Sequence, residues 1–255
     1  MSKNIIVITG ASSGIGLEFA RQTDPYFSNV DEIWLIARSR GKLAKAAEGM
    51  RHRTRILAMD ITKEAQLERL EDTLLEHDAV VRMLINCAGY GLMGEFPAQE
   101  LEGALGMVRL NCEALTHITH RCLPFMKRGS RIIQLSSSAA FLPQPGFAVY
   151  AATKSYVLSF SRALGEELKD RGIWVTSVCP GPVDTPFFDI AERSGSTLSI
   201  KKYTMVEPER VVSKALKDSY LKKPMSVCSL PIQAFEVLAK VVPHQVLLGV
   251  VNRLK

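Results

Sequence analysis

Short runs of almost continuously apolar residues recur along the chain between longer helix-like stretches, and this alternation constrains the fold more than any other feature. The run IIVIT at 5–9 has no polar residue before its threonine. Strands need apolar residues at successive positions when helices cover both faces of their sheet. Six further runs lie at 33–37, 54–59, 81–86, 131–136, 174–179 and 225–230. The pattern predicts an α/β, doubly wound fold with a seven-stranded, mostly parallel sheet and helices on both faces.

The alternation continues through the chain without an internal repeat, a low-complexity tract or a linker. With 255 residues, of which 47% are hydrophobic and 23% charged, the chain is long enough to bury one large core. We therefore expect a single domain, 1–255.

Charge and cysteine usage narrow the class of protein. The net charge of +6 comes from scattered Lys and Arg, and only RHRTR at 51–55 approaches a cluster, which favours small anionic ligands and argues against nucleic acid. The five cysteines are odd in number and widely spaced, so we expect no disulfide framework and a cytoplasmic location. No apolar signal segment or membrane-spanning run is evident, and His117, His120 and Cys122 lack the further ligands of a zinc site, so no metal is expected.

The stretch TGASSGIG at 9–16 stands between the first apolar run and a helix-like segment. A helix begins with free N–H groups and a partial positive charge, which attract phosphate. Glycines permit a tight turn and a close backbone approach, and Ser12 and Ser13 add hydroxyl donors. The spacing differs from the commonest dinucleotide fingerprint, and a turn without a ligand is the alternative. Its place after the first strand favours a dinucleotide-binding Rossmann fold.

Tyr150 and Lys154 are four residues apart in a helix-like segment, so their side chains share one helix face. A phenol ionises near pH 10, and a neighbouring ammonium lowers that pKa by favouring the phenolate. The pair is therefore suited to general acid/base chemistry. Taken alone, this spacing also occurs in many helices that have no catalytic role.

Four segments together resemble the short-chain dehydrogenase/reductase family in their order and spacing. TGASSGIG resembles the family's cofactor loop, and NCAG at 86–89 resembles its N-N-A-G motif, with Cys87 in place of the second Asn. YAATK at 150–154 matches Y-x-x-x-K, and PGPVDT at 180–185 resembles P-G-x-V-x-T. The match runs from about residue 4 to 187.

The resemblance implies a catalytic group. Ser137, thirteen residues before Tyr150, would bind the substrate oxygen, and Ser138 is the alternative within a run of three serines. Lys154 would lower the pKa of Tyr150 and bind the nicotinamide ribose. Asn111 would hold a water linked to Lys154, and a plain buried hydrogen bond is the alternative.

The second strand indicates which cofactor is used. Ala37 stands where family members that use NAD carry an acid, and Arg38 and Ser39 follow it. An arginine there pairs with a 2′-phosphate, so we predict NADP(H), with a solvated surface arginine as the alternative. Asp60 and Ile61 would contact the adenine, unless Asp60 is only a helix cap.

The remaining cofactor contacts that the resemblance implies lie in the matching segments. They are Gly10, Ser12, Ser13, Gly14, Ile15, Gly16, Asn86, Ala88, Gly89, Tyr150, Lys154, Pro180, Gly181, Val183 and Thr185.

The expected function is NADPH-dependent reduction of a hydrophobic ketone or aldehyde to an alcohol, or the reverse oxidation. A substrate lid is expected at 185–205, where Lys201 and Lys202 would attract an anionic substrate or simply face solvent. A 3-oxoacyl-thioester reductase and a non-catalytic NADP(H)-binding regulator are the alternatives. The expected apolar pocket, which ordinary core packing would also explain, comprises Met93, Phe141, Leu142, Phe147, Phe187 and Phe188.

The tail at 231–255 carries apolar residues at helical spacing, and Pro243 divides it into two helices. We expect this C-terminal extension to pack on its own core or on a neighbouring subunit. Docking on a membrane surface is the alternative, because Lys240, Arg253 and Lys255 flank the apolar face. The resemblance implies a homodimer or homotetramer.

Overall fold

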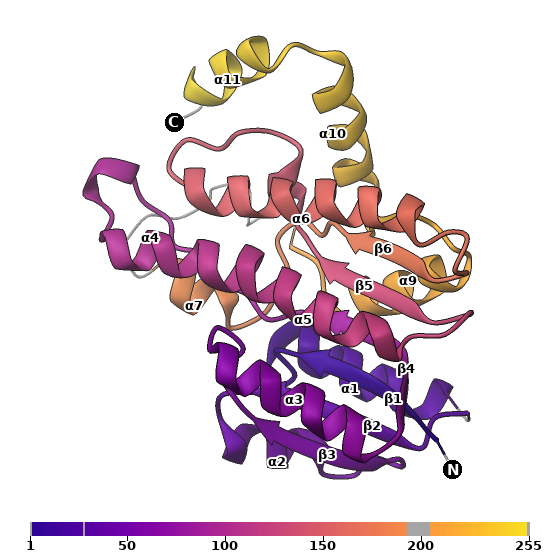
Figure 1. Ribbon diagram of the computed structural model, residues 1–255. Helices are drawn as coiled ribbons and strands as arrows, with labels where there is room; N and C mark the ends of the chain where they lie inside the picture. The colour runs from indigo at the N-terminus through magenta and orange to yellow at the C-terminus, as the bar shows by residue number, and fades with distance from the viewer. Residues whose placement is uncertain (1, 28, 193–204, 254–255) are drawn as a thin grey trace.

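A computed structural model describes residues 2–27, 29–192 and 205–253. Within these residues one sheet has the strand order β3-β2-β1-β4-β5-β6-β7, and every pairing is parallel (Figure 1). Its strands are β1 (Lys3–Thr9), β2 (Glu32–Ala37), β3 (Arg53–Ala58), β4 (Ala79–Asn86), β5 (Arg131–Leu135), β6 (Trp174–Val178) and β7 (Met225–Ser226).

The predicted strands β1 to β6 agree with the structure to within two residues at each end. The last prediction, 225–230, is too long, because β7 ends at Ser226 and a helix follows from Leu230. Pro231 lies in the first turn of that helix, where its missing N–H is tolerated, whereas a strand would need that donor for its ladder.

Helices connect the strands. They are α1 (Gly14–Tyr26), α2 (Arg40–Ala47), α3 (Glu64–Glu76), α4 (Leu101–Val108), α5 (Leu115–Cys122), α6 (Ala148–Glu167), α7 (Phe187–Ala191), α9 (Pro208–Tyr220), α10 (Leu230–Val241) and α11 (His244–Arg253). A π-helical segment, Arg109–Ala114, joins α4 to α5. As predicted, Pro243 separates α10 from α11.

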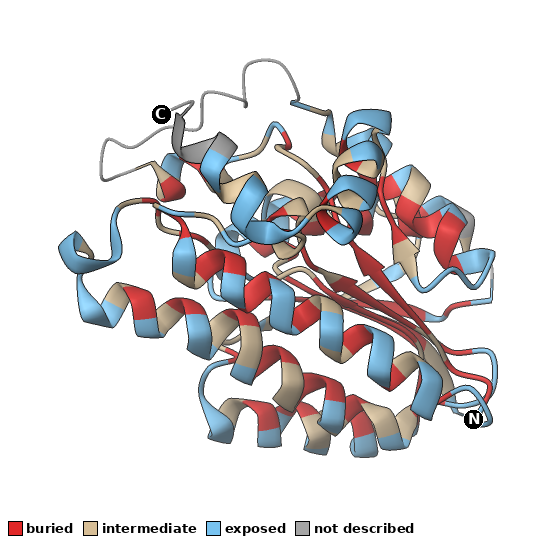
Figure 2. Ribbon diagram, turned by 90° about the horizontal axis from the view of Figure 1, so that it is seen from above, coloured by how far each residue is buried: buried red, intermediate tan, exposed pale blue. Residues whose placement is uncertain are grey.

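Two hydrophobic cores cover the two faces of the sheet. Ile5 and Val7 point into a core shared with α3, α5 and α6, whereas Ile6 and Ile8 point into a core shared with α1, α2 and α9. Figure 2 shows the strands as a buried layer between helices whose outer surfaces are exposed. The continuous apolar runs in the sequence thus reflect a sheet that is covered on both faces.

The strand order reverses between β1 and β4, which creates a crevice at the carboxyl ends of the strands, where ligands bind in open α/β sheets. The chain reaches this edge through the loops after β1, β2, β4, β5 and β6.

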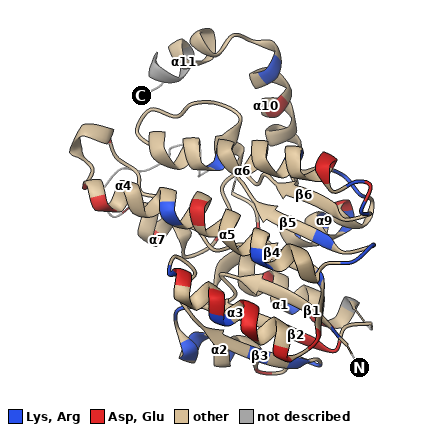
Figure 3. Ribbon diagram, in the orientation of Figure 1, with Lys and Arg blue, Asp and Glu red and all other residues tan. Residues whose placement is uncertain are grey.

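The amino-terminal edge of the sheet carries a buried ionic cluster instead. The carboxylate of Glu32 accepts hydrogen bonds from Lys3 Nζ (2.8 Å) and Trp34 Nε1 (3.0 Å), and Arg55 Nε lies 3.4 Å away. Figure 3 shows red and blue segments around the starts of β1, β2 and β3.

Two further observations concern the described residues alone. Cys87, Cys112, Cys122, Cys179 and Cys228 are free thiols. None of the helices that the structure describes is long and apolar enough to cross a membrane.

Candidate active site

The turn after β1 is packed tightly against the loop after β4. Gly10 has a φ of +67°, and a Cβ there would lie 2.8 Å from the backbone nitrogen of Ala88. A Cβ on Gly16 would lie 2.3 Å from the carbonyl oxygen of Gly10. The hydroxyl of Thr9 accepts hydrogen bonds from the N–H groups of Cys87 and Ala88, both at 3.1 Å. A side chain at Gly10 would therefore force the two loops apart, and a side chain at Gly16 would push the turn after β1 away from the start of α1.

The amino terminus of α1 opens toward the same crevice. Ser13 occupies the N-cap position with extended backbone, and within the described residues its side chain makes no capping hydrogen bond. The first turn carries no acidic residue. The first N–H groups of the helix and the hydroxyls of Ser12 and Ser13 thus remain available to an anionic group, and the geometry fits a dinucleotide phosphate.

A cavity of about 1890 Å³ extends from this turn to the start of α6. Most residues expected to bind the cofactor or the substrate line it. They are Gly10, Ser12, Ser13, Gly14, Ile15, Gly16, Arg38, Ser39, Asp60, Ile61, Ala88, Gly89, Ser137, Tyr150, Lys154, Pro180, Gly181, Val183 and Thr185.

Of the expected cofactor-binding and catalytic residues, two lie outside the cavity wall, and Asn86 is one of them. Its Nδ2 donates to Thr119 Oγ1 and to Gln134 Oε1, both at 3.0 Å, and the side chain is buried among the central strands. Asn86 therefore connects the end of β4 to β5 and α5 and does not face the cavity.

Asn111, the second, is fully buried in the π-helical segment. Its Oδ1 accepts from the N–H of Tyr90 (3.1 Å), and its Nδ2 donates to the carbonyl of Tyr90 (2.9 Å) and to Thr153 Oγ1 (3.0 Å). The side-chain amide of Asn111 thus connects the loop after β4 to α6. These contacts match the alternative in which Asn111 forms plain buried hydrogen bonds.

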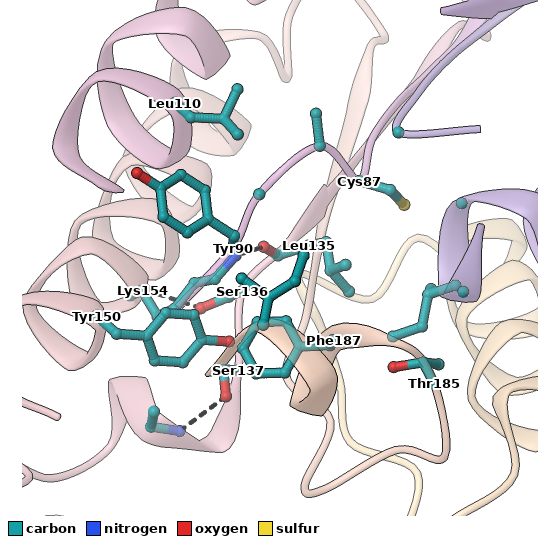
Figure 4. Close-up of a pocket in the computed structure, with 18 of the residues that line it drawn as sticks. Cys87, Tyr90, Leu110, Leu135, Ser136, Ser137, Tyr150, Lys154, Thr185 and Phe187 are labelled. Carbon is teal, nitrogen blue, oxygen red and sulfur yellow. Dashed lines mark hydrogen bonds between the residues drawn. The ribbon is translucent and has the colours of Figure 1, made fainter. Parts of the chain in front are cut away.

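Tyr150 and Lys154 lie in the first two turns of α6, as their spacing predicts. Tyr150 stacks on Phe147 at 4.2 Å between ring centroids. On its other side it lies beside Phe187, with 5.4 Å between the ring centroids (Figure 4). Burial in this aromatic cluster raises the pKa of Tyr150 to about 12, although a hydrogen bond with Ser137 acts in the opposite direction. Lys154 is not among the groups that shift this pKa, so the expected lowering by Lys154 is absent in the protein alone, where desolvation dominates.

The position of the Lys154 ammonium explains why Lys154 does not lower the pKa of Tyr150. Its Nζ donates to the carbonyl of Leu135 at 2.7 Å and lies 5.7 Å from the ring centroid of Tyr150. Burial lowers the pKa of Lys154 to about 8. Both groups of the pair are thus shifted toward their neutral forms.

The three serines after β5 have different partners. Ser136 donates to the carbonyl of Lys154 at 2.7 Å and is buried. Ser137 is the hydrogen-bond partner of the Tyr150 phenol, and its Oγ also accepts from the N–H of Ala139 at 3.1 Å. The N–H of Ser138 donates to the carbonyl of Pro180 at 2.8 Å. Of the two candidates, Ser137 is the one that meets Tyr150 (Figure 4).

The far end of the cavity, after β2 and β3, is basic. Arg38 is exposed at its wall, and Ser39 caps α2 by accepting the N–H of Lys42 at 3.4 Å. Asp60 accepts from the N–H and hydroxyl of Thr62, whereas the N-cap of α3 is Lys63, so the helix-cap alternative for Asp60 is wrong.

The other end is apolar, and five of the six residues expected there line it: Met93, Leu142, Phe147, Phe187 and Phe188. Phe141 does not; its ring packs on Phe235 at 6.2 Å. Met205 of the expected lid is described, but 193–204, including Lys201 and Lys202, lie outside the described residues.

Sequence reasoning missed several residues of the wall, among them Lys42, Tyr90, Pro231, Ile232 and Phe235. Lys42 could have been found, because it lies in the first turn of α2, which Ser39 caps directly after Arg38. The α10 residues carried no local signal, since only the tertiary fold brings them to the cavity.

A doubly wound sheet, a glycine turn at its crevice, and a half-buried Ser137 beside the buried Tyr150 and Lys154 define a dinucleotide-binding protein with a site for proton exchange. The family model described as short chain dehydrogenase matches residues 4–194. The chain therefore belongs to the short-chain dehydrogenase family, as its four motifs indicated.

Individual relatives agree with this assignment. Sulfoacetaldehyde reductase 2 of Chromohalobacter salexigens is 34% identical over 192 residues, which cover 72% of this chain and 74% of the relative. A short-chain dehydrogenase from Sphingobium yanoikuyae in complex with NADPH is 27% identical, with a TM-score of 0.77 and coverage of 94% and 96%. The bulky-bulky ketone specific alcohol dehydrogenase from Comamonas testosteroni is 25% identical, with a TM-score of 0.72 and coverage of 94% of each chain.

Proposed function

We propose that this short-chain oxidoreductase uses NADPH to reduce a hydrophobic ketone or aldehyde to an alcohol, and that Ser137, Tyr150 and Lys154 carry the reaction. The observation that supports this most is the meeting of these side chains in one cavity whose opposite ends are basic and apolar. A bound reduced nicotinamide would supply the hydride.

Tyr150 is proposed as the proton donor. With a pKa of about 12 the phenol is protonated at neutral pH, so it can give its proton to the oxygen of the substrate. The Ser137 hydroxyl would hold that oxygen and stabilise its developing charge. Lys154 would position the cofactor ribose and favour the phenolate that forms. Asn111 would help to position Lys154 through its hydrogen bond to the neighbouring Thr153.

NADP(H) is proposed over NAD(H) because Arg38 and Lys42 line the cavity wall after β2 and could bind a 2′-phosphate. Ala37 stands at the position where an acidic residue would bind the free 2′-hydroxyl of NAD(H). The NADPH complex of the Sphingobium relative supports this choice. The remaining cofactor contacts are proposed for the glycine turn, Asp60, Ile61 and the 180–185 loop.

The direct test is an assay of NADPH and, separately, NADH consumption with hydrophobic ketones, aldehydes and acyl thioesters. We expect reduction of a hydrophobic ketone or aldehyde with a preference for NADPH. Activity confined to acyl thioesters would favour a 3-oxoacyl-thioester reductase. NADPH binding without turnover of any carbonyl compound would contradict the proposal and favour a regulator.

A further inference from the structure

Two separate apolar clusters contribute walls to the cavity. One contains Phe147, Tyr150 and Phe188, and the other contains Ile232 with Phe141 packed against it. The short turn after Ser137 divides them, because Ala139 belongs to the first cluster and Phe141 to the second. A group bound at Ser137 therefore lies at the boundary between two apolar regions.

Helix α10 supplies Ile232, the residue of the second cluster that lines the cavity. Ile232 is buried, and a Cβ on Gly181 would lie 2.9 Å from its Cδ1, so the side chain rests on the loop after β6. Phe235, one turn later, packs on Phe141, and both α10 residues line the cavity. On the opposite face of the helix Val237 is 60% exposed.

Helix α10 is a feature of this chain beyond the part matched by the family model, which ends at residue 194. Figure 1 shows α10 and α11 apart from the helices that cover the sheet. The cavity-lining residues of α10, namely Pro231, Ile232 and Phe235, are all apolar. A helix of this kind offers a wall for an apolar group and no partner for a charged one.

We propose that α10 builds a second apolar subsite, and that the substrate is a ketone with a bulky apolar group on each side of its carbonyl. With the carbonyl oxygen at Ser137 and Tyr150, one substituent lies against Phe147 and Phe187 and the other against Ile232 and Phe235. This inference rests on the proposed function, because it assumes that a carbonyl group binds at Ser137.

The test compares kcat/KM, with NADPH, for a diaryl ketone and for the matching aryl methyl ketone. We expect the wild-type protein to prefer the diaryl ketone by at least about tenfold, the discrimination that a well-fitted apolar pocket provides. Ile232→Trp fills the second subsite and should reduce this ratio by about tenfold or more, while the aryl methyl ketone is still reduced. Val237→Trp, on the exposed face of the same helix, is the matched control and should leave the ratio as it is.

A second variant covers the case in which Ile232→Trp fails to fold, as judged by its thermal midpoint. Phe235→Ala removes a wall without overpacking and should also lower the ratio. Wild-type preference for the aryl methyl ketone, or an unchanged ratio in the folded variants, would overturn the subsite while leaving the reductase in place. Failure of the wild-type protein to reduce any carbonyl compound would instead overturn the proposed function, and this inference with it.

Discussion

Buried ionisable groups at the two edges of the sheet have pKa values that are shifted in opposite senses, toward the charged form at one edge and toward the neutral form at the other. At the amino-terminal edge burial alone would raise the pKa of Glu32, but hydrogen bonds from Lys3 and Trp34 and nearby cations lower it to about 2. At the carboxyl edge burial dominates, and it raises the pKa of Tyr150 to about 12 and lowers that of Lys154 to about 8.

Asp24 and Asp218 follow the pattern of Glu32. Burial acts to raise both pKa values, and hydrogen bonds lower them: from the backbone at Arg51 and His52 for Asp24, and from Lys214 and Ser226 for Asp218. At one edge hydrogen bonds thus stabilise the charged forms, whereas at the other burial shifts both pKa values toward the neutral forms of the groups. Perturbed groups gathered in a cavity are typical of a functional site.

The largest effect is expected at the carboxyl edge, from Tyr150→Phe. Removal of the phenolic proton should lower NADPH-dependent turnover by about 10²- to 10⁴-fold, the usual contribution of a general acid. NADPH affinity, measured by fluorescence titration, and the unfolding midpoint should be unchanged, because the ring remains stacked on Phe147. Turnover close to that of the wild type would remove Tyr150 from the mechanism.

At the amino-terminal edge, Glu32→Gln should affect stability and spare activity. Lys3 and Arg55 lose their charged partner, so the free energy of unfolding in urea should fall by about 2 kcal/mol. The control is Glu166→Gln, which breaks an exposed pair with Lys169 and should change stability by less than about 0.5 kcal/mol. Equal effects of the two variants would contradict the buried-ion account.

The stability difference between the wild type and Glu32→Gln should also depend on pH. The pKa of Glu32 is lowered from 4.5 to about 2 on folding, so the unfolded state binds the proton more readily. The contribution is present above pH 4.5 and lost as the pH falls toward 2.

Arg38→Ala tests the basic end of the cavity. Loss of a charge-assisted hydrogen bond to the 2′-phosphate should raise the Kd for NADPH by about tenfold and leave that for NADH unchanged. Arg40→Ala is the matched control, because Arg40 lines a different, small cavity beside β3. A variant that weakens both dinucleotides equally would show that Arg38 does not read the phosphate.

The smallest effect is the pH dependence of the reaction. With a pKa lowered from 10.5 to about 8, Lys154 loses its charge as the pH rises through 8. We expect kcat/KM with NADPH to fall to about half between pH 7 and 8 and to continue downward. A profile that stays flat to pH 9.5 would show that the Lys154 charge does not contribute.

The strands could be predicted well from the sequence because a sheet covered on both faces requires apolar residues at successive positions. Residues 5 to 8 show this, since they point alternately into the two cores. It also predicted the neighbourhood of Tyr150 and Lys154, since helical periodicity fixes their relation. The direction of the Tyr150 pKa shift was missed because burial depends on Phe147 and Phe187, which come from other segments.

The role of α10 was missed for the same reason. The spacing of the apolar residues predicts that Ile232 and Phe235 share a helix face. It does not indicate against which part of the fold that face packs. Gly181 and Phe141, fifty or more residues earlier in the chain, decide it.

A crystal structure with NADP⁺ and a ketone-like inhibitor tests the central claim most directly. We expect the nicotinamide beside Tyr150 at the carboxyl edge, with the inhibitor oxygen within hydrogen-bonding distance of both the phenol and Ser137. A dinucleotide bound away from the glycine turn, or an inhibitor oxygen out of reach of Tyr150, would contradict the account.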